Sequence, residues 1–356
     1  MRDLPHDTRA CNPHTLERRQ RITGKPMQMR AVWYNGAGGP GVIELREVPL
    51  PEPGPQEIRV RVHAAGLNRA DLLQRMGRYP APPGWPSQIP GLEYAGTVEL
   101  RGPGAARWQT GDRVMGLVGG GAHAEAVVVR EDEVIPIPRS LSYAEAAAIP
   151  EAFITAWDAL VHRARVSAGD HVLIHAVGSG VGTAAVQLAR FLGVRSAGTS
   201  RTAAKLERVM EMGLDEAIDT STGPFLPRLS EKVHALIDCL GGPMLMENLN
   251  ALLPRGRLVL IGHLLGGRGE LDLGVVLRQR LEIIGTVMRS RAPVERATLA
   301  REFTQEVLPA FVISAGGEGP RLRPVVDAVL PMTELARAHE LMETNDTFGK
   351  VILTWT

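Results

Sequence analysis

The stretch VLIHAVGSGVGTAAVQLAR, residues 172–190, decides the fold of this chain. It begins as a continuous apolar run, passes through a glycine-rich turn and continues with apolar residues at helical spacing. That order predicts a buried strand, a tight turn and a helix. The turn resembles the dinucleotide-binding pattern G-x-G-x-x-G but departs from it. Val177 and Ser179 stand where a pattern ending at Gly182 would have its first two glycines.

The turn nevertheless keeps what phosphate binding requires. Gly178, Gly180 and Gly182 leave little side-chain bulk where the backbone must approach a pyrophosphate. Ser179 adds a hydroxyl group, and a helix beginning near Val181 offers free N–H groups and the positive end of its dipole. A glycine turn with a purely structural role is the alternative. We favour binding of a dinucleotide because the turn directly follows a buried strand.

The end of the next expected strand indicates which dinucleotide binds. A site for NAD places an Asp or Glu about 20 residues beyond the turn, where it holds the ribose hydroxyls. The sequence has no carboxylate there, and Ser200, Arg201 and Lys205 supply one hydroxyl group and two cations instead. This set suits a ribose 2′-phosphate, although the cations could also be the solvated start of a helix. We expect the cofactor to be NADPH.

The pattern of the chain changes on both sides of this region. Between residues 151 and 290, apolar strands alternate with helical segments, which is typical of a parallel sheet covered on both faces. Residues 29–150 and 291–356 contain most of the remaining strand signals, punctuated by glycine and proline. The predicted fold class is α/β. A Rossmann-type, doubly wound parallel sheet is inserted in a β-rich domain, with one boundary near Pro150.

Composition excludes several kinds of partner. The 356 residues have a formal net charge of +1 and no apolar run of the ~20 residues that a membrane helix needs, so we expect no nucleic-acid or membrane partner. The two cysteines, Cys11 and Cys239, cannot build a disulfide framework or a four-thiolate zinc site, which favours the cytoplasm. Residues 1–28 are polar and arginine-rich without a signal-peptide core; we expect a flexible extension or an upstream start before Met29.

Several long motifs resemble one known family. The segments HAAGLNRADLLQRMGRYPAPPGWPSQIPGLEYAGTV (63–98) and AAAIPEAFITAWDAL (146–160), together with the stretch quoted above, are similar to the quinone oxidoreductase (zeta-crystallin) branch of the zinc-independent medium-chain dehydrogenases/reductases. Within that branch the likeness is greatest to the tumour-suppressor-inducible type, and it extends from Met29 to the end of the chain. The resemblance implies a GroES-like catalytic domain around a Rossmann domain, NADPH as cofactor, and a homodimer.

The resemblance also implies roles for individual residues. Asn68 corresponds to an asparagine beside the nicotinamide, and Thr155 to a threonine near the cofactor phosphates. Tyr79 either borders the substrate cleft, with a catalytic role, or is a packed loop aromatic. Leu73 and Thr220 stand where some relatives have tyrosines, so substrate and adenine contacts differ. Further cofactor contacts are implied at Cys239, Gly262, His263, Thr286, Met288, Asn345 and Lys350.

The pattern argues against catalytic zinc. Zinc-dependent members of the superfamily have a cysteine where Asn68 stands and a histidine where Leu92 stands, and their four-cysteine loop is missing. We therefore expect no metal site. The sequence offers no His, Lys or Tyr proton donor tied to a second group, which predicts protonation by water and a shallow pH dependence.

The expected function is NADPH-dependent reduction of a quinone or a similar conjugated carbonyl. Two alternatives stay open: a 2-enoyl thioester or enone reductase, which needs the same hydride, and a non-catalytic NADPH-binding protein. The apolar segment LEIIGTVM, residues 281–288, is expected at the edge of the Rossmann sheet. An unpaired edge strand invites pairing with its twin, so we expect a two-fold homodimer across it.

Overall fold

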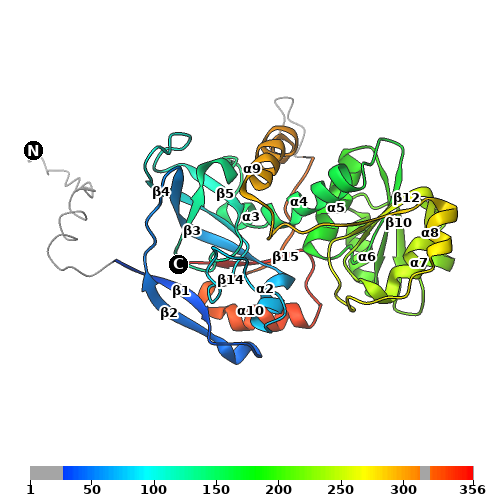
Figure 1. Cartoon of the computed structure of the whole chain (residues 1–356), viewed down its shortest axis with the longest axis horizontal. Helices are drawn as coiled ribbons and strands as arrows, with labels where there is room; N and C mark the ends of the chain where they lie inside the picture. The colour runs from blue at the N-terminus through cyan, green and yellow to red at the C-terminus, as the bar shows by residue number, and fades with distance from the viewer. Residues whose placement is uncertain (1–26, 313–320, 356) are drawn as a thin grey trace, which may run out of the picture.

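The computed structural model describes residues 27–312 and 321–355, and they form two lobes (Figure 1). Strands from both ends of the chain gather in one lobe, where the C-terminus also lies, and the middle of the chain forms the other. The expectations for the extension before Gln28, and for Cys11 within it, concern residues that lie almost entirely outside the described part. No helix of the described residues is long and apolar enough to cross a membrane.

One sheet joins strands from the two ends of the chain. Its members are β3 (Glu57–Leu67), β4 (Glu93–Arg101), β5 (Arg113–Leu117), β6 (Ala126–Arg130), β7 (Val134–Pro136), β14 (Val326–Pro331) and β15 (Lys350–Thr354). The order is β14-β15-β3-β4-β5-β7, with β6 pairing on β3. The strands β1 (Gln28–Tyr34) and β2 (Ile43–Pro49) form a separate two-stranded sheet. Because β15 pairs antiparallel with β3, the last strand lies beside the end of β3, which leads to Asn68.

The other sheet is parallel throughout. Its strands are β8 (His171–Ile174), β9 (Arg195–Ser200), β10 (Glu216–Asp219), β11 (Val233–Asp238), β12 (Leu252–Leu260) and β13 (Glu282–Gly285). They lie in the order β10-β9-β8-β11-β12-β13. Numbered within the sheet, this is 3-2-1-4-5-6, the order of a doubly wound dinucleotide-binding fold. The predicted fold class is confirmed.

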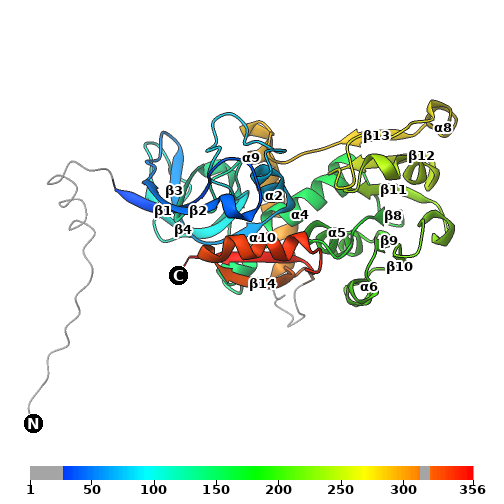
Figure 2. The same ribbon diagram turned by 90° about the horizontal axis from the view of Figure 1, so that it is seen from below.

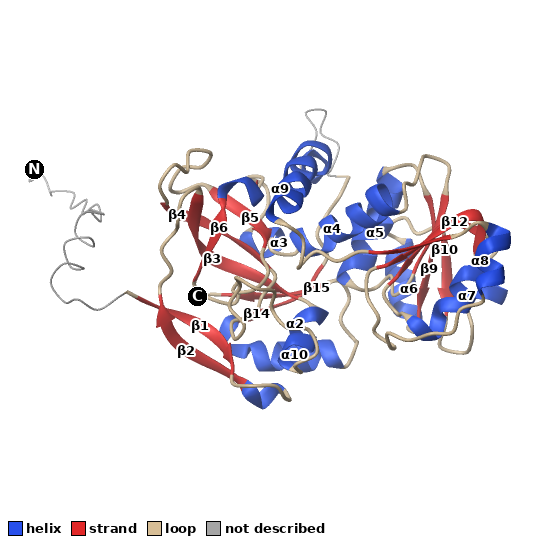
Figure 3. Ribbon diagram, in the orientation of Figure 1, coloured by secondary structure: helices blue, strands red, loops and turns tan. Residues whose placement is uncertain are grey.

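Helices cover both faces of this parallel sheet (Figure 3). The α-helices of the described residues are α2 (Arg69–Arg75), α3 (Tyr143–Ala146), α4 (Pro150–Trp157), α5 (Gly180–Phe191), α6 (Ala203–Met210), α7 (Leu245–Asn250), α8 (Leu273–Gln279), α9 (Pro293–Glu302) and α10 (Leu335–Glu343). In β8, Val172 and Ile174 pack into the core on one face, while Leu173 packs into the core on the other. Residues on both faces are apolar, which explains the continuous apolar run.

The boundary expected near Pro150 coincides with the first residue of α4. Proline suits this position, because the first residues of a helix need no intrahelical N–H bond. A π-helical segment, Asp158–Arg163, continues α4. We retain as a proposal the division into residues 29–150 with 291–356 and residues 151–290.

Strand β13 lies at the edge of the parallel sheet, as the sequence predicts for its segment. Figure 2 shows it along the outer side of its lobe, with α8 at the far end. The side chains of Ile283 and Val287 are exposed there. The homodimer across this edge stays a prediction.

Candidate functional site

The glycine turn between β8 and α5 carries little side-chain bulk, because every second residue from Gly178 to Gly182 is a glycine. Ser179 caps α5 by accepting a hydrogen bond from the Gly182 N–H at 3.0 Å, and its O–H remains able to donate. A Cβ on Gly182 would lie 2.6 Å from Val177 Cα, so only glycine lets α5 pack this closely on the strand. The helix begins at Gly180, one residue before the expected Val181.

Two lysines lie over the same turn. A Cβ on Gly178 would meet Lys205 Cδ at 2.8 Å, and one on Gly180 would meet Lys350 Cδ at 2.6 Å. The stems of both lysines thus pass over the turn, while their ammonium groups bond other residues. The free N–H groups and the N-terminus of α5 themselves favour an anionic ligand. This arrangement fits a pyrophosphate.

The C-terminal strand reaches this turn and joins the two lobes. Gly349 N–H donates to the Gly178 carbonyl at 2.9 Å, and Gly349 also forms a bridge with Ser179. Gly349 has φ +88°, and a Cβ there would lie 2.4 Å from the Val325 carbonyl. A glycine is therefore required where the start of β15 passes the turn.

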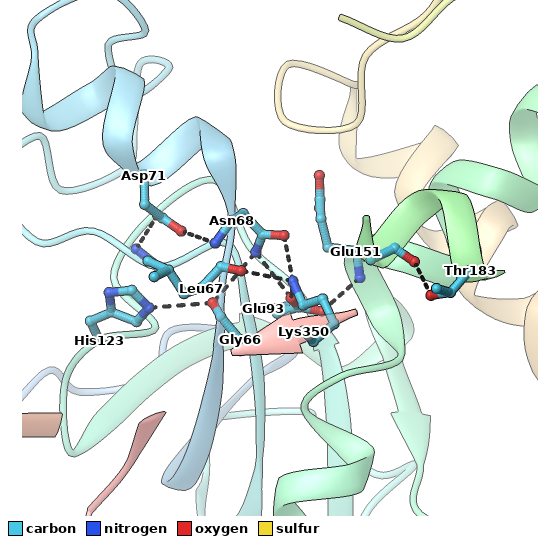
Figure 4. A network of polar contacts seen from close by, with 11 residues as sticks. Gly66, Leu67, Asn68, Asp71, Glu93, His123, Glu151, Thr183 and Lys350 are labelled. Carbon is cyan, nitrogen blue, oxygen red and sulfur yellow. Dashed lines mark hydrogen bonds and ion pairs between the residues drawn. The ribbon is translucent and has the colours of Figure 1, made fainter. Parts of the chain in front are cut away.

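Lys350 leads from the turn into a buried polar network (Figure 4). Its ammonium group pairs with Glu93 Oε1 at 2.6 Å and donates to Asn68 Oδ1 at 2.6 Å and to the Leu67 carbonyl at 3.0 Å. Asn68 Nδ2 in turn donates to Glu93 Oε1 at 3.0 Å. Both Lys350 and Glu93 are buried. The network fixes the orientation of the Asn68 amide.

Sequence reasoning singled out Asn68 and Lys350 but missed Glu93. The available signal was a charged residue in the apolar segment PGLEYAG, at the start of β4. A carboxylate that is 0% exposed requires partners, and these come from three other segments of the chain, at Asn68, Glu151 and Lys350.

The three residues expected to bind a 2′-phosphate lie together around the end of β9. Arg201 is exposed and makes no hydrogen bond or ion pair among the described residues. Lys205 Nζ donates to the backbone carbonyl of Asn345, and desolvation lowers the pKa of Lys205. Ser200 Oγ accepts from the Thr202 N–H at 3.1 Å. Arg201 is thus available to a ligand, whereas Lys205 already has one partner.

Asn345 is placed by its backbone as much as by its side chain. It follows α10 with φ +61°, a left-handed conformation that asparagine tolerates, and its Oδ1 accepts from Arg69 at 2.6 Å. The structure therefore brings Asn345 to Lys205, near the 2′-phosphate residues.

Thr155 carries one of the buried polar atoms that lack a hydrogen-bond partner among the described residues. Its side chain lies in α4, is 9% exposed, and its Oγ1 has no hydrogen-bond partner within the described residues. Buried hydroxyl groups are nearly always hydrogen-bonded in complete structures. An orphaned donor in a helix that packs on α5 fits a bound cofactor.

The other residues predicted to contact the cofactor lie in different environments. Cys239 directly follows β11, and burial raises the pKa of its thiol to about 12, so it is not a thiolate nucleophile. Gly262 lies against it, with a Cβ position 3.5 Å from Cys239 Cα. The imidazole of His263 is exposed. Thr286 donates its hydroxyl proton to Asp158 at 2.7 Å, and Met288 is buried in the core between the lobes.

Tyr79 lies beside a buried arginine that sequence reasoning missed. The Arg289 guanidinium donates to the Tyr79 carbonyl at 2.9 Å, to Gln74 Oε1 at 2.6 Å and to the Gly119 carbonyl at 2.7 Å. It also lies over the Tyr79 ring at 5.1 Å. Arg289 thus holds the loop that carries Tyr79, and the Tyr79 hydroxyl has no hydrogen bond among the described residues.

Glu151 is a second missed carboxylate. It is the second residue of α4, and its backbone N–H donates to Glu93 Oε2 at 2.8 Å. Burial and the neighbouring Glu93 raise the pKa of Glu151 to about 8. A charged residue between Pro150 and the apolar remainder of its helix was the signal in the sequence.

The described residues contain no group of three or more His, Cys, Asp or Glu side chains placed to hold a metal ion. Leu92 is buried, at 1% exposed, and Asn68 is engaged with Glu93 and Lys350.

Comparison with known proteins agrees with this geometry. Residues 54–139 match the family described as alcohol dehydrogenase GroES-like domain, and residues 180–305 match the family described as zinc-binding dehydrogenase. The quinone oxidoreductase of Homo sapiens is 31% identical over 93% of this chain and 99% of its own length. That of Pseudomonas aeruginosa is 32% identical over 91% and 99%. The chain belongs to the quinone oxidoreductase branch of the medium-chain dehydrogenases/reductases. The predicted family is confirmed.

Solved structures show the same relationship. A quinone oxidoreductase from Pseudomonas syringae has a TM-score of 0.81 at 27% identity, covering 92% of this chain and 99% of its own. The CurK enoyl reductase has a TM-score of 0.80 at 26% identity, covering 93% and 100%. The chain is therefore an oxidoreductase of a family that binds a nicotinamide cofactor.

Proposed function

We propose that this protein transfers a hydride from NADPH to a quinone or a similar conjugated carbonyl without zinc. The observation that carries the proposal is that the residues assigned to the phosphates and those assigned to the nicotinamide adjoin one another. The capped glycine turn is contacted by Lys205, which follows the free Arg201 after β9, and by Lys350, which bonds Asn68 in a buried network. Relatives named quinone oxidoreductase over nearly the whole chain support the choice of acceptor.

NADPH, when bound, supplies the hydride, and the protein binds and orients it. The glycine turn and the α5 N-terminus would hold the pyrophosphate, and Arg201 and Lys205 would hold the 2′-phosphate. The hydroxyl group of Thr155, unpaired among the described residues, would be available to a phosphate oxygen. Asn68, locked by Lys350, positions the nicotinamide end. Holding the two reactants in one geometry is the main source of rate enhancement in such a reaction.

The proposal of zinc independence depends on two positions. Asn68 and Leu92 replace the ligands of the zinc-dependent relatives, and neither offers a thiolate or an imidazole. Treatment with a chelator, followed by metal analysis, should leave the specific activity unchanged. Stoichiometric zinc that is lost together with activity would disprove this part.

Reduction of an enone or a 2-enoyl thioester is the competing activity, favoured by the CurK enoyl reductase among the similar structures. NADPH oxidation followed at 340 nm separates the two, with 1,4-naphthoquinone and crotonyl thioester tested in parallel. We expect the higher kcat/KM with the quinone. A higher value with the thioester would favour the enoyl reductase. Tight NADPH binding without turnover of either would indicate the non-catalytic alternative.

We also propose a two-fold homodimer across β13 and a cytoplasmic location. The edge position of β13 and its exposed Ile283 support the first. The low cysteine content supports the second. Light scattering at micromolar concentration tests the dimer, and an Ile283→Lys variant should shift it to monomer.

A further inference from the structure

Glu151 has a carboxyl group without a partner beside the network of Figure 4. Its backbone N–H bonds Glu93, but its own carboxyl oxygens make no hydrogen bond or ion pair with any described residue. In Figure 4 the side chain projects away from Glu93 and Lys350, and no interaction reaches its end. The residue keeps partial contact with solvent. Such a carboxyl group is available to a ligand.

Charged and titratable groups from several elements surround this carboxyl. Glu93 of β4 and Asp71 of α2 oppose its ionisation, whereas Lys350 of β15 and Arg289, just after β13, favour it. Tyr79, from the loop after α2, also senses the charge of Glu151. Elements of both lobes therefore converge on Glu151, at the place where the proposed nicotinamide residue Asn68 lies.

We propose that Glu151 is the acid that protonates the reduced acceptor, an inference that rests on the proposed function. Bound NADPH would supply the hydride with its two electrons, and its addition would convert a quinone into the hydroquinone monoanion. The O–H bond of Glu151 then breaks, its proton forms the second O–H bond of the hydroquinone, and Glu151 remains as a carboxylate. A proton from water restores the acid before the next cycle.

The direction of the Glu151 pKa agrees with this role. Burial and the Glu93 carboxylate raise it to about 8, so most of the Glu151 population carries a proton at pH 7. A proton donor works best when its pKa lies near the operating pH. Glu151 thus takes the place of water, the proton source that the sequence alone suggested.

The neighbouring groups are less suited to donate this proton. Lys350 already donates to Asn68 and Leu67 and pairs with Glu93. Burial raises the pKa of Tyr79 above its usual value, which makes it a weaker acid. His123 is 0% exposed, and burial lowers its pKa, which disfavours the protonated form that a proton donor needs. Glu93 oxygens accept bonds from three different residues.

The test is the pH profile of kcat/KM with NADPH and 1,4-naphthoquinone for wild type and Glu151→Gln. Because the protonated form is active, the wild-type value should be level below pH 7 and fall through a pKa near 8. The variant should lose about 100-fold or more at pH 6.5, and its profile should be flat across pH 8. A solvent deuterium isotope effect should be present in wild type and absent in the variant. Glu151→Asp, which keeps an acid, should retain the alkaline fall.

Two controls separate this role from a structural one. Glu340→Gln changes an exposed glutamate of α10 and should behave as wild type. The NADPH dissociation constant of Glu151→Gln, measured by fluorescence titration, should stay within about threefold of wild type. An active wild type whose Glu151→Gln variant keeps the same rate and pH profile would overturn the role of Glu151 alone. A wild type that binds NADPH but reduces neither quinone nor enone would overturn the proposed function, and with it this role.

Discussion

The glycine turn and the Asn68–Glu93–Lys350 network touch one another but are built differently. The turn is local: residues 177–182 supply the strand end, the cap and the close helix contact. The network is assembled from β4, β15 and the start of α2, so that Lys350 bonds a residue 282 positions away in the chain. The conformation of the turn therefore depends mainly on its own residues, whereas the network forms only when the whole lobe has folded.

The largest effect is expected from breaking the network at its charge pair. In Lys350→Met, the carboxylate of Glu93 loses its counter-ion while it stays buried. Removing one partner of a buried ion pair costs about 3–5 kcal/mol. Urea denaturation should show this loss, together with a large decrease in kcat/KM. The double variant Lys350→Met with Glu93→Gln should recover part of the stability. If the single and double variants were equally destabilised, the charge pair would not be the cause.

The turn was predictable from sequence because its signals are contiguous. The spacing of Gly178, Gly180 and Gly182 after an apolar run predicts the strand, the turn and the helix together. Arg201 and Lys205 follow at the end of the next strand and are equally readable. The fold class followed from the same alternation, since repeated strand–helix units permit few architectures.

The network could not be predicted in the same way. Glu93, Glu151 and Arg289 lie far apart in the sequence, and only the packing of β4, α4 and the segment after β13 brings them together. In the sequence each is a charged residue near apolar residues. This pattern marks the residue as unusual but does not identify its partner. Thr286 is a related case: its motif predicts a cofactor contact, which stays a prediction, but gives no sign of the hydrogen bond that its hydroxyl group donates to Asp158.

The next effect concerns the turn itself. In Gly182→Ala the new methyl group would lie 2.5 Å from the Ala176 carbonyl, and backbone cannot yield as a side chain can. Overpacking of this kind costs about 1–3 kcal/mol. The shift of α5 should also weaken NADPH binding, measured by fluorescence titration. Gly285→Ala is the matched control, because a Cβ there meets nothing within 4 Å. Equal behaviour of the two variants would contradict the close-packing role of Gly182.

The preference for NADPH over NADH tests the roles of Arg201 and Lys205, which follow β9. Arg201→Ala with Lys205→Ala should lower the ratio of kcat/KM for NADPH over NADH by roughly 10–100-fold, since charge-assisted hydrogen bonds to one phosphate contribute about 1.5–3 kcal/mol. Arg201→Ala alone is the cleaner variant, because Lys205 also bonds the Asn345 carbonyl. The rate with NADH should change little. A wild type that uses both cofactors equally, or a ratio unchanged in the double variant, would refute the 2′-phosphate assignment.

The smallest effect is expected at Tyr79. Its substitution tests whether this residue donates a proton or only packs beside the Asn68–Glu93–Lys350 network. The Arg289 guanidinium bonds the Tyr79 carbonyl and lies over its ring, so the loop is held by contacts that a phenylalanine keeps. The hydroxyl group, whose pKa burial raises, is a poor acid compared with the Glu151 carboxyl. Tyr79→Phe should therefore lower kcat/KM with a naphthoquinone by less than about 10-fold, whereas loss of a real proton donor typically costs 10²–10⁴-fold. A loss above roughly 100-fold, with the alkaline fall near pH 8 abolished, would transfer the proton-donor role from Glu151 to Tyr79.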